Sequence, residues 1–595
     1  MAEPIQVDFE GRKRKTGPKT IVIPPERAGL RVALSVVGAL LTAAVAYYAM
    51  LPPLNFKAKE FYYYLGLVFA SFIVFLFLLC RAGSQPEYAP YVKQKSTVSI
   101  VAIVVTALFF AIALGVSSPF FNARRYSEIM PVSEDASFVS DIQEANFAAI
   151  PKLDESAAKA VAERTLGALA DYVSQFTISA SNTQINYREK PVRVVALGYA
   201  DLIKWLTNTR QGLPGYVIVD MANEKSEFVR LESKIRYSDA EHFGKLLKRH
   251  LRFNFPSYMF GIPNFEINDE GHPFWIAPRV DKTIGLLGGE DVIGIVLVDA
   301  VTGECTQYDI DKVRTDSELQ WIDRVYSASM LTTQYNYHGK YAGGFWNSLL
   351  GQKGVKVATS GYNYIAKDDD VFMYTGVTSA NEDNSIIGFI LVNQRSKEAV
   401  FYKMEGATES SAQEAAQGLV SAYKWTATFP LLVNVSSQPT YFLSLKDDSS
   451  VVQGYSMVNV AQYNKIKVWG KTLAECTSLY IQALKDNGVD INQSQPIDPG
   501  NELPGPGGQM TASGAITFIR GDIVINGNTT FYIQLDNGGP YYTITAAQAP
   551  EAVLLGKDMM VTVSYIPLEG GNIIPASSVE PIHSSPMIPA EGPAD

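Results

Sequence analysis

Three long stretches without a charged side chain stand out near the N-terminus when hydrophobic and polar positions are followed along the chain. They cover residues 32–51, 61–80 and 96–123. The hydrocarbon core of a bilayer is about 30 Å thick, and a helix needs roughly 20 apolar residues to cross it. Three such stretches in succession are not typical of buried core helices or of a signal peptide. The pattern therefore predicts three transmembrane helices within residues 31–120.

Basic residues flank these stretches unevenly. Seven precede the first stretch, three lie between the second and the third, and the first connection holds only Lys57 and Lys59. Because positively charged flanks stay in the cytoplasm, residues 1–30 are expected to form a basic cytoplasmic segment. Three crossings then place the chain after about residue 120 outside the cytoplasm of a multi-pass cell-membrane protein. The stretches hold no Asp, Glu, Lys, Arg or His, which favours an anchor in the lipid bilayer over a transport path.

A second pattern occurs four times within residues 121–485. Each copy has a Gly, three mostly apolar residues, a Val and then Asp or Asn, and the copies are Gly215–Asp220, Gly294–Asp299, Gly388–Asn393 and Gly454–Asn459. An apolar or aromatic residue follows nine positions later, at Val229, Tyr308, Tyr402 and Val468. This spacing predicts a β-strand, a turn made by the Asp or Asn side chain, and a returning strand.

The repeated unit extends beyond the hairpin. Apolar and aromatic strands precede three copies, at His272–Ile276, Asp370–Tyr374 and Thr440–Ser444. Residues 240–251, 410–423 and 472–484 have apolar positions near the helical period. We therefore predict α+β modules, each a helix followed by an antiparallel meander. The copies are too unevenly spaced for a solenoid with a fixed period.

The segment Val298–Glu304, which reads Val-Asp-Ala-Val-Thr-Gly-Glu, resembles the PepSY module of extracytoplasmic bacterial proteins. Residues 321–402 are similar to uncharacterised multi-span membrane proteins of Gram-positive bacteria, and the resemblance covers about residues 190–485. It implies PepSY-like extracytoplasmic repeats. PepSY-like modules are associated with restraining or binding peptidases and cell-wall enzymes, and no catalytic residue comes with the resemblance.

The C-terminal part of the chain changes character. Residues 486–512 are predicted to be a Pro/Gly linker, and residues 581–595 a disordered Pro-rich tail. Between them, five short strands are expected at Ala515–Arg520, Asp522–Ile525, Thr529–Leu535, Tyr541–Ala546 and Met559–Tyr565. Asn526-Gly527 and Asn537-Gly538 are hairpin turn signals. Residues 513–580 therefore predict a small β-barrel, OB-like or SH3-like, that contacts protein or a second copy of the chain, with glycan contact as the alternative.

Charge excludes one class of partner. Residues 1–125 carry a net charge of +8, whereas the rest of the 595-residue chain carries −18. A nucleic-acid binder needs basic surface to neutralise phosphates, so nucleic acid is not an expected partner. Three cysteines and five histidines do not make a disulfide-dense scaffold or a multi-metal enzyme. A disulfide between Cys305 and Cys476 stays open as an alternative to small buried apolar roles.

Motifs with catalytic chemistry are missing. The histidines lack metal-ligand spacing, and Gly285–Gly289 lacks the Lys-Ser/Thr of a phosphate loop. Asp368–Asp370 and Asp447-Asp448 do not follow a calcium loop and are expected to be solvated turns. The sequence therefore predicts no catalytic residue, cofactor or metal, and a protein that is not an enzyme. Glu266 with Asp269 would matter only in a glycan-processing protein.

One aromatic cluster is the candidate partner-binding site, at Tyr335, Tyr337, Tyr341, Phe345 and Trp346. Aromatic anchors dominate protein interfaces, although they also fill cores between modules. The expected function is a membrane-anchored extracytoplasmic scaffold or regulator that binds an envelope protein such as a peptidase or cell-wall enzyme. The alternatives are a cell-wall glycan-binding or glycan-processing protein, and an accessory subunit of a membrane transport complex.

Overall fold

The computed structural model describes residues 22–147, 149–367, 369–380, 385–489, 510–525, 528–536, 540–546, 549–565 and 573–581. The chain forms two compact units, Met1–Ser494 and Gln495–Asp595. Residues 1–21 of the predicted basic segment, most of the predicted linker, both Asn-Gly turns, Asp368 and all but the first residue of the predicted tail lie outside the described residues.

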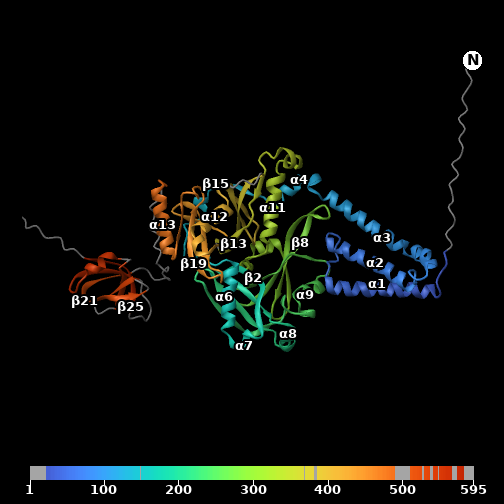
Figure 1. Ribbon diagram of the computed structural model, residues 1–595, viewed down its shortest axis with the longest axis horizontal. Helices are drawn as coiled ribbons and strands as arrows, with labels where there is room; N and C mark the ends of the chain where they lie inside the picture. The colour runs from blue at the N-terminus through green and yellow to red at the C-terminus, as the bar shows by residue number, and fades with distance from the viewer. Residues whose placement is uncertain are drawn as a thin grey trace, which may run out of the picture. The chain divides into compact units, whose positions relative to one another are not determined.

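Three long apolar helices begin the first unit, α1 (Ala28–Met50), α2 (Lys59–Leu79) and α3 (Ala89–Val116) (Figure 1). At 1.5 Å per residue each exceeds 30 Å, so each is long enough to cross a bilayer. Large apolar side chains such as Leu40, Val45 and Leu108 are exposed on the bundle, as lipid-facing positions require. The predicted membrane anchor is confirmed by three helices of suitable length and composition. A short helix, α4 (Pro119–Ser127), follows α3.

In the described residues, the rest of the first unit contains four sheets, each built on an antiparallel meander that follows a helix in sequence. Module 1 has α6 (Glu155–Gly167), β2 (Phe176–Tyr187), β3 (Lys190–Tyr199), β4 (Leu213–Asp220) and β5 (Lys225–Ile235). Module 2 has α9 (Leu247–Asn254), β6 (Met259–Phe260), β7 (Asn264–Ile267), β8 (Pro273–Ile284), β9 (Gly288–Asp299) and β10 (Cys305–Asp309).

Modules 3 and 4 repeat this order. Module 3 has α11 (Ala328–Tyr341), β11 (Lys356–Ala358), β12 (Asn363–Lys367), β13 (Asp370–Ser379), β14 (Ser385–Asn393) and β15 (Ala399–Ala407), and β1 (Ser133–Ala136) adds in parallel to β15. Module 4 has α12 (Glu409–Leu419), β16 (Thr426–Ala427), β17 (Leu431–Val435), β18 (Gln438–Lys446), β19 (Val452–Asn459) and β20 (Lys467–Gly470), followed by α13 (Leu473–Asp486). Shorter helices are α5 (Phe138–Asp141), α7 (Ala170–Val173), α8 (Leu202–Asn208) and α10 (Ile310–Thr315).

The repeated sequence pattern forms the central hairpin of every module. Tyr216 pairs with Val229, Ile295 with Tyr308 and Phe389 with Tyr402, so three copies share one register. In the fourth copy Met457 pairs with Val468. The Asp or Asn makes the predicted turn each time. For example, Asp299 Oδ1 accepts hydrogen bonds from the backbone N–H groups of Val301 and Thr302 at 2.7 and 2.9 Å.

The first strand of the meander has an irregularity that the sequence did not reveal. In modules 2, 3 and 4 two short strands, β6 and β7, β11 and β12, and β16 and β17, pair with the same neighbour. In module 1 the equivalent strand β2 is continuous, but its register with β3 shifts between residues 178 and 182. The four modules therefore share topology more closely than their sequences indicate.

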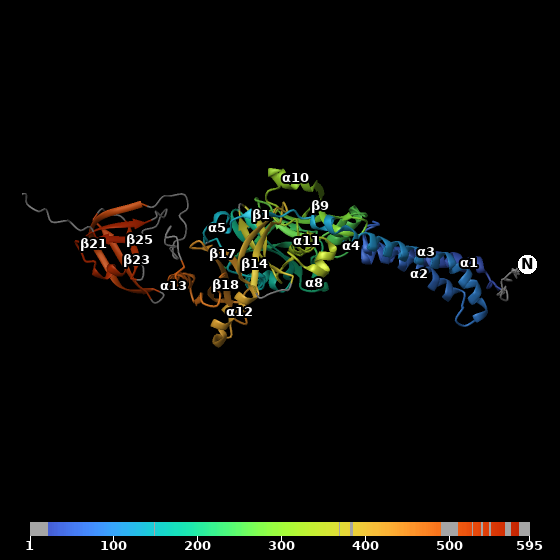
Figure 2. The same cartoon turned by 90° about the horizontal axis from the view of Figure 1, so that it is seen from above.

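The sheet of module 2 lies between modules 1 and 3. Side chains alternate across a strand, and those of β9 divide between two cores. Val296 and Val298 pack with the strands of module 1, whereas Ile295 and Leu297 pack with Tyr335 and the strands of module 3. Because both faces of β9 are covered in its second half, residues 292–298 form an unbroken run without charged side chains. Figures 1 and 2 show the modules at one end of the helix bundle.

Two of the three predicted helices form close to their predicted bounds, as α12 and α13. The prediction for residues 240–251 was wrong in its first half, because α9 begins only at Leu247. Side-chain bonds hold the preceding residues in a loop: Glu241 accepts hydrogen bonds from the Tyr199 hydroxyl at 2.6 Å and from Trp205 Nε1 at 2.9 Å. His242 and His250 therefore do not share one helix.

The second unit is a closed barrel in the order β21-β22-β23-β25-β24. Its strands are β21 (Met510–Ile525), β22 (Asn528–Leu535), β23 (Tyr541–Thr545), β24 (Met560–Tyr565) and β25 (Ile573–Pro581). The first two predicted strands are one long strand, β21, which pairs with both β22 and β24. The strand β25, whose two prolines weakened its signal, was missed and closes the barrel between β23 and β24.

Two segments of the anchor contact module 2: the connection from α1 to α2 and the C-terminal end of α3. In the connection from α1 to α2, the Leu54 N–H donates to the Pro256 carbonyl at 2.8 Å, and Lys57 pairs with Asp281 at 2.7 Å. At the end of α3, Ser117 Oγ accepts the N–H groups of Leu286 and Leu287 at 3.0 and 3.1 Å. The glycine-rich turn at residues 285–289 is thus the seat of α3 on module 2.

Candidate partner-binding surface

The five aromatic residues proposed from the sequence occupy three environments along α11 and the segment after it. Tyr335 is 1% exposed and belongs to the core shared by modules 2 and 3, so it does not reach the surface. Tyr337 and Tyr341 are half-buried against Tyr126 of α4, with ring centroids 4.7 and 6.2 Å away. Tyr337 and Tyr341 therefore join module 3 to α4, which follows the anchor, whereas Tyr335 joins module 3 to module 2.

Phe345 and Trp346 lie after the helix, beyond Gly344. Gly344 has φ +86°, a left-handed conformation that suits glycine, and it redirects the chain toward α4. The rings of Phe345 and Trp346 meet the Phe120 ring edge-on, with centroids 5.2 and 5.9 Å away. A single π-helical turn, η4 (Asn347–Gly351), follows them.

These contacts build an exposed apolar surface, which we call the aromatic ledge. It comprises Phe120, Phe121, Phe345, Trp346, Leu349 and Leu350. Phe121 is 69%, Trp346 61% and Leu350 75% exposed. Contiguous exposed apolar surface of this kind marks interaction sites, because it costs free energy when it faces water. Only Phe345 and Trp346 of the ledge were among the residues proposed from the sequence.

The ledge lies at the C-terminal end of α3, the third helix long and apolar enough to cross a membrane. A span that begins at Ser96, the start of the uncharged stretch, covers about 30 Å by residue 115 or so. Phe120 and Phe121 follow within one turn or two, and their ring contacts place Trp346 beside them. Aromatic side chains are favoured at this interfacial level. The ledge therefore continues the exposed apolar face of α3 onto module 3.

The ledge is held in place by polar contacts. Asn347 Nδ2 donates to the Lys353 carbonyl at 3.0 Å, and Asn347 Oδ1 accepts the Lys353 N–H at 3.2 Å, which closes the loop around η4. Tyr126 donates its hydroxyl to the Ser117 carbonyl at 2.7 Å, which ties α4 to the end of α3. The surface is thus fixed relative to the anchor and need not fold on binding.

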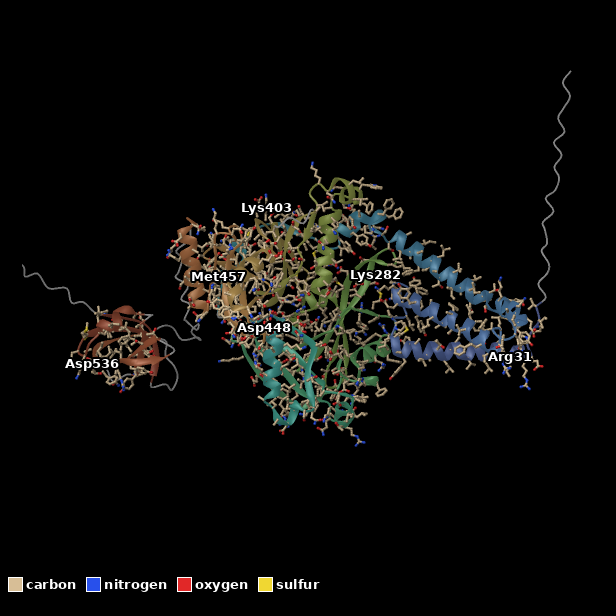
Figure 3. All side chains as sticks on the ribbon, in the orientation of Figure 1. Arg31, Lys282, Lys403, Asp448, Met457 and Asp536 are labelled. Carbon is tan, nitrogen blue, oxygen red and sulfur yellow. The ribbon has the colours of Figure 1, made fainter. Side chains whose placement is uncertain are left out.

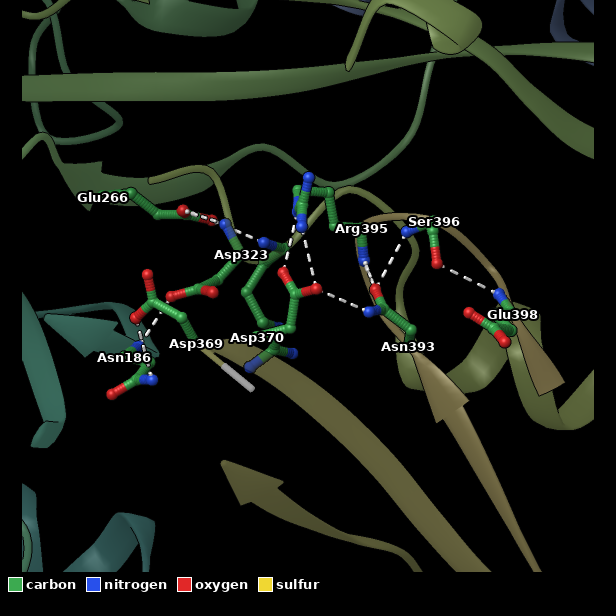
Figure 4. Close-up of polar contacts among 10 residues, drawn as sticks. Asn186, Glu266, Asp323, Asp369, Asp370, Asn393, Arg395, Ser396 and Glu398 are labelled. Atoms are coloured by element: carbon green, nitrogen blue, oxygen red, sulfur yellow. Dashed lines mark hydrogen bonds and ion pairs between the residues drawn. The ribbon is translucent and has the colours of Figure 1, made fainter. Parts of the chain in front are cut away.

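A separate polar centre joins modules 1, 2 and 3, and Figure 4 shows it. Glu266 on β7 is completely buried, and its carboxylate accepts the N–H groups of Asp323 and Arg324 at 3.0 and 3.1 Å. Asp323 Oδ2 accepts the Asn186 N–H at 2.6 Å, and Asp323 Oδ1 has no partner. Burial raises the pKa of Glu266 to about 7 and raises that of Asp323 well above its usual range, with the Glu266 charge adding to the latter shift.

Two backbone N–H groups and the Arg324 charge favour the ionised form of Glu266, whereas Asp323 receives one backbone N–H and is the carboxyl group that stays protonated. This arrangement explains the outcome for the acids considered in the sequence: Glu266 pairs with Asp323, whereas Asp269 lies in a turn where its carbonyl accepts from Arg188 at 2.7 Å. Both carboxyl groups are buried and bonded to backbone N–H groups, so a glycan substrate cannot reach them as it reaches the acids of a glycosidase. Their role here is to join modules.

The neighbouring aspartates also serve the fold. Asp370 receives Nε and Nη2 of Arg395 at 2.7 and 2.8 Å and Asn393 Nδ2 at 2.7 Å. It is therefore a buried ion-pair residue at the start of β13, not a solvated turn residue as predicted. Within the described ranges, no cluster of His, Cys, Asp and Glu has the geometry to hold a metal ion.

The cysteines are free. Cys305 lies on β10, with Sγ 3.5 Å from His250 Nε2, and Cys476 is buried in α13. Burial raises the pKa of both thiols, to about 11 and about 12, so neither is an activated nucleophile. The disulfide between them does not form in this structure.

Comparison of the chain with protein-family models, with curated proteins and with solved structures found no match.

Proposed function

We propose that this protein is a membrane-anchored extracytoplasmic scaffold or regulator, and that the aromatic ledge binds an envelope protein embedded in the same membrane. The observation that carries the proposal is the exposed apolar ledge, rigidly continuous with a transmembrane helix. A partner that packs on α3 within the bilayer would also contact the ledge at the membrane surface. The interface would then cover both α3 and the ledge, and this protein would not need to change conformation.

Insertion of the ledge into lipid is the competing explanation, and the anchor argues against it. Three transmembrane helices already hold the chain in the bilayer, and two connections fix module 2 on them. Additional insertion of Trp346 and Leu350 adds little to such attachment. For a protein partner, however, aromatic and aliphatic anchors beside a rigid support supply most of the binding energy.

The orientation proposed from the charges agrees with how basic residues divide along the anchor. Figure 3 places Arg31 at the end of the bundle that is distant from the modules and Lys282 on the modules themselves. Arg27, Arg31, Arg81, Lys93 and Lys95 all lie at or beyond the distant end. A cytoplasmic location of that end, with the modules outside, follows the positive-inside rule.

The proposed module types fit the same role. A helix followed by an antiparallel meander supports the PepSY-like interpretation of the four modules, which is a binding fold rather than a catalytic one. The barrel has the strand order 1-2-3-5-4 with a first strand shared between two neighbours, which supports the OB-like interpretation over the SH3-like one. Its acidic composition favours a protein ligand over nucleic acid.

Affinity purification of the full-length protein from its own membranes tests the proposal. The double variant Trp346→Ser, Leu350→Ser removes the ledge's most exposed anchors and should reduce recovery of a membrane-protein partner by at least about tenfold. The matched control is Val553→Ser, Leu554→Ser, which removes two equally exposed apolar side chains from the barrel.

Undiminished recovery with the ledge variant contradicts the proposal. Equal loss with the barrel variant contradicts it too, because general loss of apolar surface would then explain the effect. If the recovered partner is a polytopic transporter, the protein is an accessory subunit of a membrane transport complex that binds through the ledge.

A further inference from the structure

A cavity of about 190 Å³ lies where modules 1, 3 and 4 meet, away from the ledge. It opens between the start of α6, strands β2 and β3, strand β12 and strand β18. Its walls include Arg193 and Gln184 from module 1, Tyr362 and Tyr364 from module 3, and Phe429 and Phe442 from module 4. A cavity of this volume has room for several waters or a small organic molecule and not for a folded segment.

Arg193 is the unusual wall residue. It is only 5% exposed, and its guanidinium has neutral partners: Nη1 donates to Asn182 Oδ1, and Nη2 donates to Gln184 Oε1 at a long 3.3 Å. Its Nε has no partner. Among the described residues, no carboxylate forms an ion pair with it. Burying a cation without a counter-charge is costly, so structural arginines are normally paired.

A second guanidinium increases the positive charge. Arg324 lies over the Tyr364 ring, 4.3 Å from its centroid, and Nη2 donates to the Tyr364 hydroxyl at 2.8 Å. Its Nε is also buried without a partner. Burial, followed by the Arg324 charge, lowers the pKa of Arg193 to about 10 against a partial offset from Glu155, so Arg193 stays charged at neutral pH.

The acids near the cavity are engaged elsewhere. Asp154 pairs with Lys446 at 2.5 Å and caps α6 by accepting the Ala157 N–H at 2.8 Å. Glu155 is exposed at the rim, where Oε1 accepts from Asn182 Nδ2 at 3.2 Å. The cavity wall therefore has one buried guanidinium, that of Arg193, with the Arg324 charge acting on it and no carboxylate that is free to pair with it.

We propose that this cavity binds a small carboxylate, which displaces the Gln184 side chain and accepts Nε–H and the adjacent Nη2–H of Arg193 with its two oxygens. This side-on edge of a guanidinium matches a carboxylate in a bidentate arrangement, and Gln184 holds it only weakly. The aromatic walls suit the organic remainder of the ligand. The carboxylate belongs either to a free small acid or to the C-terminus of a short peptide. Since the cavity is formed by three modules, its ligand clamps them together. This proposal does not depend on the ledge.

Thermal unfolding of the full-length protein in detergent tests the proposal, with sodium succinate, trialanine, the C-terminal amide of trialanine and inorganic phosphate as probes. A ligand that binds only the folded state raises the Tm with its concentration. Succinate or trialanine should raise the Tm of the native chain, and the amide should not. A response to succinate identifies a free acid as the source, whereas a response confined to trialanine identifies a peptide terminus.

The variant Arg193→Gln should abolish the rise in Tm, and Arg193→Lys should reduce the apparent affinity at least about tenfold because a lysine has no bidentate edge. The control Lys190→Gln removes the same charge from an exposed position three residues earlier on β3 and should respond as the native chain does. Without ligand, Arg193→Gln should unfold at the same Tm as the native chain or higher, since it removes an uncompensated buried charge.

Three results overturn the proposal: no rise in the native chain with any carboxylate up to 10 mM, about the weakest affinity worth assigning to a site; an equal rise with Arg193→Gln; or a larger response to phosphate than to every carboxylate. If Arg193→Gln does not fold, the comparison of trialanine with its amide, and of Arg193→Lys with Lys190→Gln, still decides the question.

Discussion

The buried pair of Glu266 and Asp323 shows how single side chains set the joint between modules. Each carboxyl group is desolvated, and only Glu266 receives two backbone donors. The folded chain therefore binds a proton that the unfolded chain releases at ordinary carboxyl pKa values. Between about pH 4 and the raised folded-state pKa, the folded state holds more protons, so stability falls as the pH rises through that window. Above about pH 7, the stability that the folded state gains from protonating Glu266 is lost.

The variant Asp323→Asn should stabilise the protein at pH 8. The amide retains an acceptor for the Asn186 N–H and replaces a group that must otherwise be held protonated or buried as an anion. We expect a gain of about 1–3 kcal/mol at pH 8 and a flatter dependence of Tm on pH between 5 and 8.

Glu266→Gln is the contrasting variant, because an amide nitrogen would face a backbone N–H that the carboxylate now accepts. It should lower the Tm at both pH values. Thermal unfolding of both variants at pH 5 and pH 8 checks this account, and a loss of stability at pH 8 with Asp323→Asn would show that the proton is not held there.

At the scale of elements, the central hairpin owes its shape to an Asp or Asn at one position. Asp220, Asp299 and Asn393 each accept two backbone N–H groups in the turn, and Asn459 accepts one. Short polar side chains that bond forward along the chain stop a strand and reverse it. The turn is thereby encoded locally, whatever the module packs against.

Replacing Asp299 by Ala should cost about 1–2 kcal/mol, because the N–H groups of Val301 and Thr302 lose their acceptor. Asp299→Asn keeps Oδ1 and should cost clearly less. Urea unfolding monitored by tryptophan fluorescence measures both, and equal effects of the two variants would contradict a role for the turn bonds.

These local rules explain what was predictable. The central hairpins, α12 and α13, and three barrel strands follow from alternation, caps and turns within a few residues. The loop before α9 did not, since it depends on Glu241 meeting Tyr199 and Trp205 from distant parts of module 1. The split first strands and β25 are likewise set by long-range pairing. No local signal separates them from irregular chain.

The candidate site was also only partly predictable from the sequence. Aromatic content singled out the segment from Tyr335 to Trp346, but composition does not say that Tyr335 points into a core while Trp346 points out. Phe120 and Phe121 were visible in the sequence as an aromatic pair at the end of the third apolar stretch. What was missing was the contact that joins them to Trp346, more than 220 residues away.

At the scale of the whole molecule, the seat of α3 on module 2 fixes the modules relative to the membrane. Gly285 has φ +59°, and a Cβ there would lie 2.4 Å from Ser117 Oγ and 3.1 Å from Ser117 Cα. Gly285→Ala should therefore disrupt the seat and lower the free energy of unfolding of the first unit by about 1–3 kcal/mol.

Gly344→Ala is the control, because Gly344 also has positive φ but nothing lies within 4 Å of its added Cβ. This variant measures the free-energy cost of placing alanine at positive φ, without the steric clash that Gly285→Ala adds. If the two variants lose the same stability in detergent, close contact with Ser117 is not what holds the seat.

Photocrosslinking in intact cells shows whether the ledge contacts a protein partner beside the membrane. A photoreactive residue is placed at Leu350 on the ledge or at Asp448, an exposed turn of module 4 labelled in Figure 3. We expect a discrete protein adduct from position 350 that Trp346→Ser weakens, and no adduct of the same mass from position 448. Adducts with lipid alone from position 350, or the same protein adduct from both positions, would contradict this expectation.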